Sequence, residues 1–514
     1  MGRRTTEGGG HAHRPRLRGG RPSPVAPGRP RSHQPIRRRS GGPGTGPRAP
    51  SPARPGPALH HRPHARLPER PLPGPPFLRE RPDTPHRRRP GPGPGRGGTR
   101  PGMTGREVRG RRPPGRLRGA TMGNAPRMEP FGGTEVDARP VIGGAPAGQA
   151  RTVGVEEELL LVSERTGEPL ALAPAVLAAA AAEQAGEDRA LEKELHQEMV
   201  EFATRPHGTM DAVREELVRR RAEVARHARG AGALVAALAT SPLPVRPSRN
   251  LGRRYRWMAE QFALTTDEQL TCGCHVHVAV ASDEEGVGVL DRIRGWLAPI
   301  NAISGNSPFW QGHDSGYSSY RSRVWNRWPS AGAYEPFGSA AAYHACVREM
   351  VATGVLRDPG MVYFDARLSA ANPTVEVRVA DVCLEAETTV LVAALVRGLV
   401  ETAAREWKDG APAPAPPCAL LRLASWRAAR SGLDGPLVHP STLREAPADV
   451  VLGALVDHTE EALRDAGDLA LVRRGLTDLL ADGGGARRQR ALYEEERDLA
   501  AVVRACARIT AGDG

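Results

Sequence analysis

Three separated segments of the chain alternate apolar and polar residues with the two-residue period of a β-strand. They are TVGVEEELLLV (152–162), TCGCHVHVAV (271–280) and NPTVEVRVADV (372–382). Because successive side chains of a strand point to opposite faces, each segment has an apolar face and a face with two polar side chains. These pairs are Glu156 with Glu158, His275 with His277, and Glu376 with Arg378. We therefore expect one antiparallel sheet whose concave face is a site.

The segment LEKELHQEMVEFATRP (191–206) predicts a helix, because its apolar residues recur every three or four positions. Pro206 would end this helix. Carboxylates at helical spacing repel each other by about 0.2–0.5 kcal/mol per pair on a free helix. The acidic stripe is therefore either an ordinary solvated face or a second wall of metal ligands. Its members are Glu194, Glu198 and Glu201.

Two cysteines and two histidines fall within six positions of TCGCHVHVAV, which at first suggests a zinc site. Strand parity separates them, since Cys272 and Cys274 share the valine face while His275 and His277 share the other. Zinc would need thiolates and imidazoles that converge on one point. We therefore interpret the cysteines as core residues. The histidines taken alone could be a solvent-facing pair on a half-buried strand.

The formal net charge of +14 belongs to one end of the chain, since residues 1–120 carry +24 and the remainder carries −10. This end is rich in Arg, Pro and Gly and has few residues to bury, so it cannot offset the ordering entropy of a fold. We expect a disordered tail over 1–145 and one folded domain over 146–514. The tail is either a solvated extension or the product of a start codon assigned too early, in which case translation begins at Met122 or Met128. A nucleic-acid-binding arm is the alternative.

Cysteine spacing and hydropathy indicate the compartment. The six cysteines are irregularly spaced and no apolar leader precedes them, so no disulfide framework is expected, and the cytoplasm is predicted. No apolar run reaches the roughly 18 residues of a membrane-spanning helix, because Arg397 interrupts VLVAALVRGLV. Membrane association is not expected, nucleic acid is an unfavoured partner, and a homo-oligomer stays open.

Carboxylates combined with an imidazole form the ligand set that Mg²⁺ or Mn²⁺ prefers, and a bound cation would relieve repulsion within each acidic pair. Several such ions imply substrate phosphates, although the sequence has no Gly-rich phosphate loop. The loop FWQGHDSGYSSYRSRVWNRWP (309–329) adds arginines among aromatic residues. It could recognise carboxylate or phosphate, or be a surface loop held by cation–π packing.

Five motifs, in this order and spacing, resemble the carboxylate-amine ligases of the glutamate-cysteine ligase type 2 family. They are GVEEELLLV, ELHQEMVEFATRP, CGCHVHVAV, NSPFWQGHDSGYSSYRSRVWNRWPSAG and TVEVRVADVC. The likeness covers essentially all of residues 150–510. It implies an α+β fold, an antiparallel β-sheet funnel backed by helices, similar to the catalytic domain of glutamine synthetase.

The resemblance also implies roles for individual residues. His275 would bind a metal ion and His277 the ATP phosphates, while Arg378 would stabilise the transferring phosphoryl group beside Glu376. Glu198 stays an alternative to Glu194, because both lie on one stripe. The implied metal ligands are Glu156, Glu158, Glu194, Glu201, His275 and Glu376, and the implied substrate-binding residues are Tyr320, Arg321 and Arg323.

The activity that the resemblance implies is an ATP-dependent, Mg²⁺- or Mn²⁺-dependent joining of glutamate to cysteine through an acyl phosphate. The polar pairs specify phosphoryl chemistry better than they specify the acceptor pocket. A ligase with the same mechanism but another acid and amine therefore stays open. So does a regulatory protein that binds metal and nucleotide without turnover.

Overall fold

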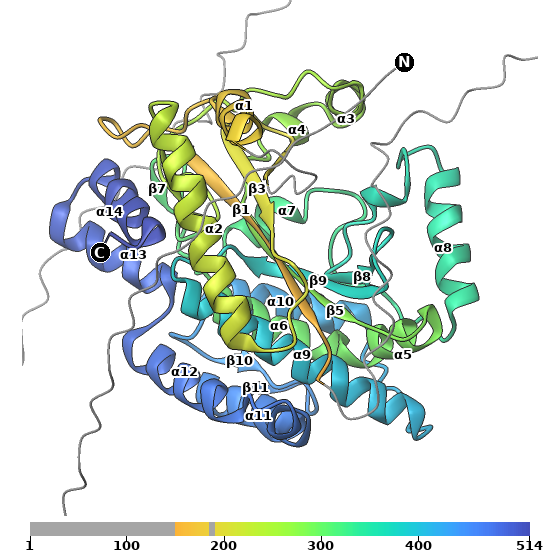
Figure 1. Cartoon of the computed structure of the whole chain (residues 1–514). Helices are drawn as coiled ribbons and strands as arrows, with labels where there is room; N and C mark the ends of the chain where they lie inside the picture. Colours follow the sequence, from red (N-terminus) through yellow and green to blue (C-terminus); the bar gives the residue numbers. More distant parts are fainter. Residues whose placement is uncertain (1–149, 184–190, 514) are drawn as a thin grey trace, which may run out of the picture. The chain divides into compact units, whose positions relative to one another are not determined.

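The computed structural model describes residues 150–183 and 191–513 (Figure 1). Within them, one seven-stranded sheet has the order β2-β3-β1-β5-β9-β8, and β4 pairs with β1 off this path. Every neighbouring pair in this sheet is antiparallel. The strands are β1 (Val153–Val162), β2 (Leu191–Lys193), β3 (Met199–Ala203), β4 (Leu234–Ala236), β5 (Gly273–Ala279), β8 (Ala366–Leu368) and β9 (Thr374–Asp381).

The three strands predicted from two-residue periodicity are adjacent at the centre of this sheet. They are β1, β5 and β9, and together they carry the apolar face that packs on the helices. Val155, Val276 and Val377 illustrate it, because each is 2% exposed or less. The α+β class with an antiparallel sheet backed by helices is confirmed. The predicted tail lies outside the described residues, and its boundary at 145 stays a prediction.

The predicted helix over 191–206 is wrong. This segment forms the β2–β3 hairpin, whose turn lies between Lys193 and Met199. In β3 the side chains of Val200 and Phe202 are fully buried, while Glu201 between them pairs with Glu158 of β1. The apolar residues of these two short strands have a helical spacing only by coincidence. Pairing of β3 with β1 determines the conformation instead.

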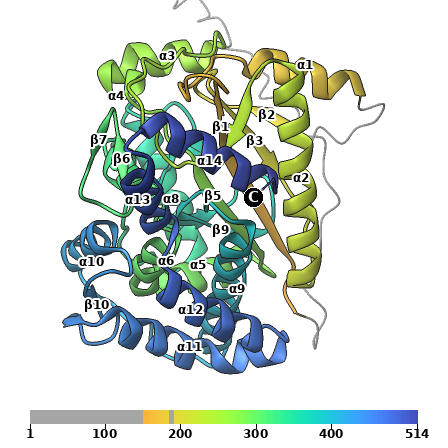
Figure 2. The same cartoon turned by 90° about the vertical axis from the view of Figure 1, so that its left-hand side faces the viewer.

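Helices cover the apolar face of the sheet. α9 (Ala386–Lys408) packs against β1 and β5, α6 (Leu297–Ser304) packs against β9, and α2 (Met210–Gly230) runs beside β1 (Figure 2). The centre of α9 is a run of Val, Leu and Ala whose side chains are nearly all buried, because it meets the sheet on one side and other helices on the other. Thr209 caps α2 by accepting a hydrogen bond from the Ala212 amide.

The remaining elements surround this core. They are α1 (Ala173–Glu183), α3 (Arg253–Phe262), α4 (Leu264–Asp267), α5 (Asp283–Ile293), α7 (Arg321–Trp325), α8 (Ala340–Ala352), α10 (Cys418–Ser431), α11 (Ala448–Asp465), α12 (Leu469–Asp482), α13 (Gly485–Glu496), α14 (Leu499–Ala511), two 3₁₀ helices (Arg294–Trp296 and Pro359–Met361) and the short strands β6 (Phe309–Trp310), β7 (His313–Asp314), β10 (Leu437–Val438) and β11 (Glu445–Ala446). Among the described helices, none combines the length and apolar character needed to cross a membrane.

Candidate active site

A row of polar residues crosses the face of the sheet opposite the apolar face on which α9 and α6 pack. Directly opposed residues of antiparallel strands point to the same face, and the register opposes the polar residues to one another. The opposed pairs are Glu158 with Glu201, Glu156 with His275, His277 with Glu376, and Glu376 with Arg367. The predicted convergence of the three polar pairs on one face is therefore observed.

Glu156 lies at the centre of this row. Its Oε2 is 3.1 Å from His275 Nδ1, and its Oε1 is 3.1 Å from His277 Nε2. Two sets of potential metal-ligand atoms share it, each with all atoms within 4.8 Å of one another: Glu156 with His277 and Glu376, and Glu156 with Glu201 and His275. A single carboxylate common to two such sets suits two neighbouring cations.

His275 has the chemistry of a neutral metal ligand. Burial, followed by the charge of Arg378, lowers the pKa of His275 to about 4. Its Nε2 atom is buried and has no hydrogen-bond partner. An uncharged imidazole with an unshared buried nitrogen fits a cation. The donor set therefore fits Mg²⁺ or Mn²⁺, and it contains no cysteine, since Cys274 faces away beside Glu157.

Two carboxyl groups of the row, Glu158 and Glu201, have raised pKa values. Burial and the nearby charge of Glu194 raise the pKa of Glu158 to about 7, although the charge of Arg321 and the Gly273 amide oppose this shift. Burial and Glu194 also raise the pKa of Glu201 well above its ordinary value. Like charges held this close either share protons or share a cation.

The hairpin separates the two glutamates that the sequence could not distinguish. Glu194 acts on the pKa of Glu158 and hydrogen bonds with Glu201, so it belongs to the row. Glu198 lies elsewhere, because both of its carboxylate oxygens accept from the Ser248 amide, at 2.8 and 3.0 Å. The geometry therefore favours Glu194 over Glu198 as a ligand.

Glu376 lies between two arginines. Arg367 Nε donates to its Oε2 at 2.8 Å, and Arg378 forms a buried ion pair with it. Burial would raise the pKa of Glu376, but the charges of Arg378 and Arg367 outweigh this effect and hold it well below its ordinary value. Arg378 keeps a buried Nε without a partner. Its guanidinium Cζ lies 5.9 Å from the centre of the Trp325 ring.

Arg367 was missed by the sequence reasoning. It lies in β8, where Ala366 and Leu368 on either side are buried. This apolar-polar-apolar triplet is the same two-residue period as in the other strands, but three residues are too few to identify a strand. Its Nη1 donates to the carbonyls of Gly360 and Val362, which fixes the guanidinium.

The three predicted substrate-binding residues have different surroundings. Arg321 is 1% exposed. Its Nη1 lies 3.9 Å from Asp381 Oδ1, and its Cζ lies 5.4 Å from the centre of the Trp325 ring. Its Nε and Nη2 have no hydrogen-bond partner. Tyr320 packs instead with Trp310 and Tyr317. Among the contacts of the described residues, none joins Tyr320 or Arg323 to the carboxylate row.

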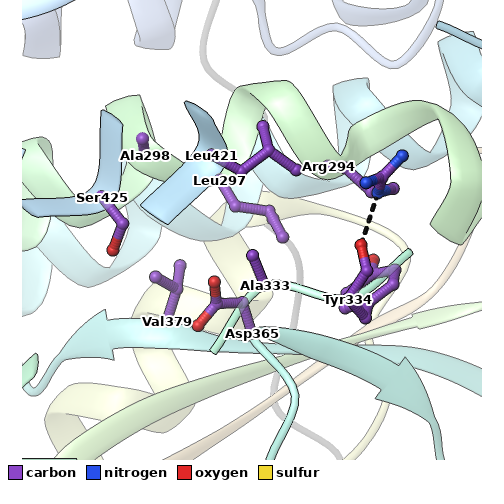
Figure 3. Close-up of a pocket in the computed structure, with 9 residues that line it drawn as sticks. All are labelled: Arg294, Leu297, Ala298, Ala333, Tyr334, Asp365, Val379, Leu421 and Ser425. Carbon is purple, nitrogen blue, oxygen red and sulfur yellow. Dashed lines mark hydrogen bonds between the residues drawn. The ribbon is translucent and has the colours of Figure 1, made fainter. Parts of the chain in front are cut away.

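A small cavity lies on the other side of β9, where Val379 points away from the row (Figure 3). Its volume is about 10 Å³, roughly the space for one water molecule. Asp365 points into it, and burial raises the pKa of this carboxyl group to about 6. The other lining residues are Arg294, Leu297, Ala298, Ala333, Tyr334, Val379, Leu421 and Ser425. This cavity is therefore separate from the candidate active site.

Fold and site together define an α+β protein whose antiparallel sheet carries carboxylates, imidazoles and arginines on one face. Residues 152–507 match the sequence model of glutamate-cysteine ligase family 2 (GCS2), and the chain belongs to this family. The family assignment made from the motifs is thereby confirmed.

Two Streptomyces proteins resemble the chain in sequence. A Streptomyces coelicolor protein named "Putative glutamate--cysteine ligase 2" is 59% identical over 360 residues, covering 70% of this chain and 99% of its own length. A Streptomyces avermitilis relative, "Putative glutamate--cysteine ligase 2-1", is 60% identical over 363 residues, covering 70% of this chain and all of its own.

Solved structures support the fold. The glutamate–cysteine ligase of Francisella tularensis, determined in complex with AMP, has a TM-score of 0.54 at 13% identity, covering 71% of this chain and 89% of that one. A bifunctional glutathione synthetase from Pasteurella multocida has a TM-score of 0.52 at 15% identity, and the match covers 71% of this chain and 53% of that one.

Proposed function

We propose that the protein is an ATP-dependent carboxylate-amine ligase that joins glutamate to cysteine. The observation that carries this proposal is the row in which Glu156 is common to two ligand sets and Glu376 is held by two arginines. Family membership and the names of the relatives support the two substrates.

The chemical problem is that a carboxylate is a poor acylating agent. In the proposed reaction a substrate carboxylate oxygen attacks the γ-phosphorus of ATP, the bond to the ADP oxygen breaks, and an acyl phosphate forms. The amine then attacks the acyl carbon, loses a proton, and displaces phosphate. The net products are an amide, ADP and phosphate.

The residues that would hold the ions are Glu156, Glu158, Glu194, Glu201, His275 and Glu376. When bound there, Mg²⁺ or Mn²⁺ would supply positive charge that offsets the negative charge of the ATP phosphates. Each of these side chains is already turned toward the row by its strand or by the hairpin, so little reorganisation is needed.

Arg378 would contact the equatorial oxygens of the transferring phosphoryl group. Its Nε is buried and free, and Glu376 holds the rest of the guanidinium in place. A charged donor in a buried position gains strength as negative charge develops. His277 would contact the phosphates. Burial lowers its pKa, but the charge of Glu156, the hydrogen bond to Glu156 and the charge of Glu376 together raise it on balance.

The Nε and Nη2 atoms of Arg321, which have no hydrogen-bond partner, support a role in carboxylate recognition, because a fork of N–H donors suits that group. Tyr320 and Arg323 are proposed substrate residues on the strength of the resemblance alone. The acid and the amine are therefore the least constrained part of the proposal.

The test is an assay of ADP release over pairs of amino acids and amines, with product masses measured. We expect release that requires glutamate, cysteine and a divalent cation, with a product mass equal to that of the dipeptide. Turnover with a different pair would correct the substrates and leave the chemistry. Binding of ATP without release across the whole panel would instead indicate a regulatory protein.

A further inference from the structure

The carboxylate between the two ligands of β1 has a partner on the opposite face of the sheet. Glu157 is fully buried, and Arg221 of α2 binds it with both arms of the guanidinium, Nε to Oε2 at 2.8 Å and Nη2 to Oε1 at 2.7 Å. Thr389 of α9 donates its hydroxyl to Oε1 at 2.7 Å. The carboxylate is thus held from two helices at once.

The remaining donors of Arg221 reach a different part of the sheet. Nη1 donates to the carbonyl of Leu384 and Nη2 to that of Cys383, both at 2.8 Å. These two residues follow β9, which ends at Asp381. One guanidinium therefore connects β1 with the chain that leaves β9.

Between these two strands lies β5, so the connection passes behind it. Cys274 of β5 is the register partner of Glu157 in β1 on one side and of Ala380 in β9 on the other. All three strands that carry predicted ligands consequently meet at this one point. The next register pair of β1 and β5 is Glu156 with His275, whose side chains point to the opposite face.

We propose that Arg221 and Glu157 form a positioning clamp, which sets the spacing between the β1 ligands and Glu376 of β9. Both side chains lie on the face of the sheet opposite the predicted ligands. A buried ion pair is weak support for stability, since apolar residues of similar volume often stabilise as well. It does fix geometry, and Mg²⁺ tolerates little deviation from an octahedron of oxygens. The clamp rests on the metal site of the proposed function.

The experiment compares Arg221→Lys with Arg397→Lys in the full chain. Arg397 is a matched control, because it is also buried in an ion pair, with Asp468, and also donates to a backbone carbonyl, that of Gly208 at 2.7 Å. None of these contacts involves a predicted ligand. Lysine keeps the charge in both variants but loses the bidentate fork.

Mn²⁺ affinity is measured by electron paramagnetic resonance and thermal stability by calorimetry. We expect Arg221→Lys to weaken Mn²⁺ binding by about 10-fold or more, as for other residues that orient ligands. Arg397→Lys should lose a comparable amount of thermal stability and keep its Mn²⁺ affinity. Thr389→Val, which removes one hydrogen bond to Glu157 and no charge, should weaken Mn²⁺ binding in the same direction by a smaller factor.

Two results would overturn the clamp. One is Mn²⁺ binding by the Arg221→Lys protein that is as tight as binding by the unsubstituted chain. If Arg221→Lys does not fold, the same result for a folded Thr389→Val protein overturns the clamp. The other is an equal loss of affinity in the Arg397→Lys control, which would show a general effect of stability. A failure of the unsubstituted chain to bind Mn²⁺ is a different outcome, because it would overturn the metal site itself.

Discussion

Glu158 is the residue whose protonation should govern ion binding. Burial and the charge of Glu194 raise its pKa to about 7, so a cation must displace a proton from it near neutral pH. Since a higher pH removes that proton, Mn²⁺ affinity should rise by about tenfold between pH 6 and pH 8 for this one group. Titrations followed by electron paramagnetic resonance at the two pH values measure it.

Glu158→Gln supplies the control for this pH dependence. The amide cannot ionise, so the variant should bind Mn²⁺ weakly at pH 8 and show a flatter pH profile. An unchanged slope would assign the titration to Glu201, whose pKa is also raised by burial and Glu194.

The same shift has a consequence for the stability of the ion-free protein. Between the ordinary carboxyl pKa and about 7, the folded state binds the Glu158 proton and the unfolded state does not. The contribution of this group to the free energy of unfolding therefore falls as pH rises through that window. Saturating Mn²⁺ should remove the fall, which thermal unfolding with and without the ion can measure.

Arg378 allows a prediction about the transition state. Its unpartnered Nε and the pairing with Glu376 present a fixed fork, and lysine cannot reproduce bidentate contact with phosphoryl oxygens. Arg378→Lys should lower kcat far more than it raises the KM for ATP, because the interaction is made mainly as charge develops. A raised KM with normal kcat would assign Arg378 to ground-state binding instead.

At the scale of elements, the two-residue period identified the long strands because each has one buried face and one face of polar pairs. β1 and β9 show this over eight or more residues. The period failed for β2 and β8, which have three residues each and whose pairing partners decide their conformation. Arg367 was overlooked for this reason, since nothing within ARL distinguishes a strand from a loop.

The β2–β3 hairpin shows what local spacing cannot reveal. Its turn is fixed by contacts from a distant loop, in which the Ser248 amide donates to Glu198 and the Asn250 amide donates to the Leu195 carbonyl. No pattern within residues 191–206 records these partners. The acidic character of the segment was nevertheless informative, because Glu201 reaches the row from a strand as it would have from a helix.

The hairpin also makes a prediction that separates its glutamates. Glu194→Gln should weaken Mn²⁺ binding, because Glu194 hydrogen bonds with Glu201 inside the row. Glu198→Gln should leave Mn²⁺ affinity within about twofold and cost roughly 1 kcal/mol of stability, as expected when a charged acceptor of backbone amides is weakened. Mn²⁺ titration and thermal unfolding of both variants provide the test. Weaker Mn²⁺ binding by Glu198→Gln than by Glu194→Gln would instead assign Glu198 as the ligand.

At the scale of the whole molecule, the two relatives align over 99% or more of their own length with 70% of this chain. The match to the family begins at residue 152. The segment that matches the family therefore spans residues 152–507, whereas the strongly positive charge lies before it. Activity and electrostatic binding to polyanions should consequently be separable.

A chain that begins at Met122 tests this separation. It loses the +24 of residues 1–120 and keeps a net charge of −10, so any salt-sensitive binding of nucleic acid by the full chain should disappear. Its unfolding temperature should change by less than the 2 °C or so that about 1 kcal/mol produces in a large domain, and its Mn²⁺ affinity should be unchanged. A marked loss of either would show that the first 121 residues contribute to the fold or the site. If the full chain binds DNA no more tightly at 50 mM than at 200 mM salt, the basic residues do not form a nucleic-acid-binding arm.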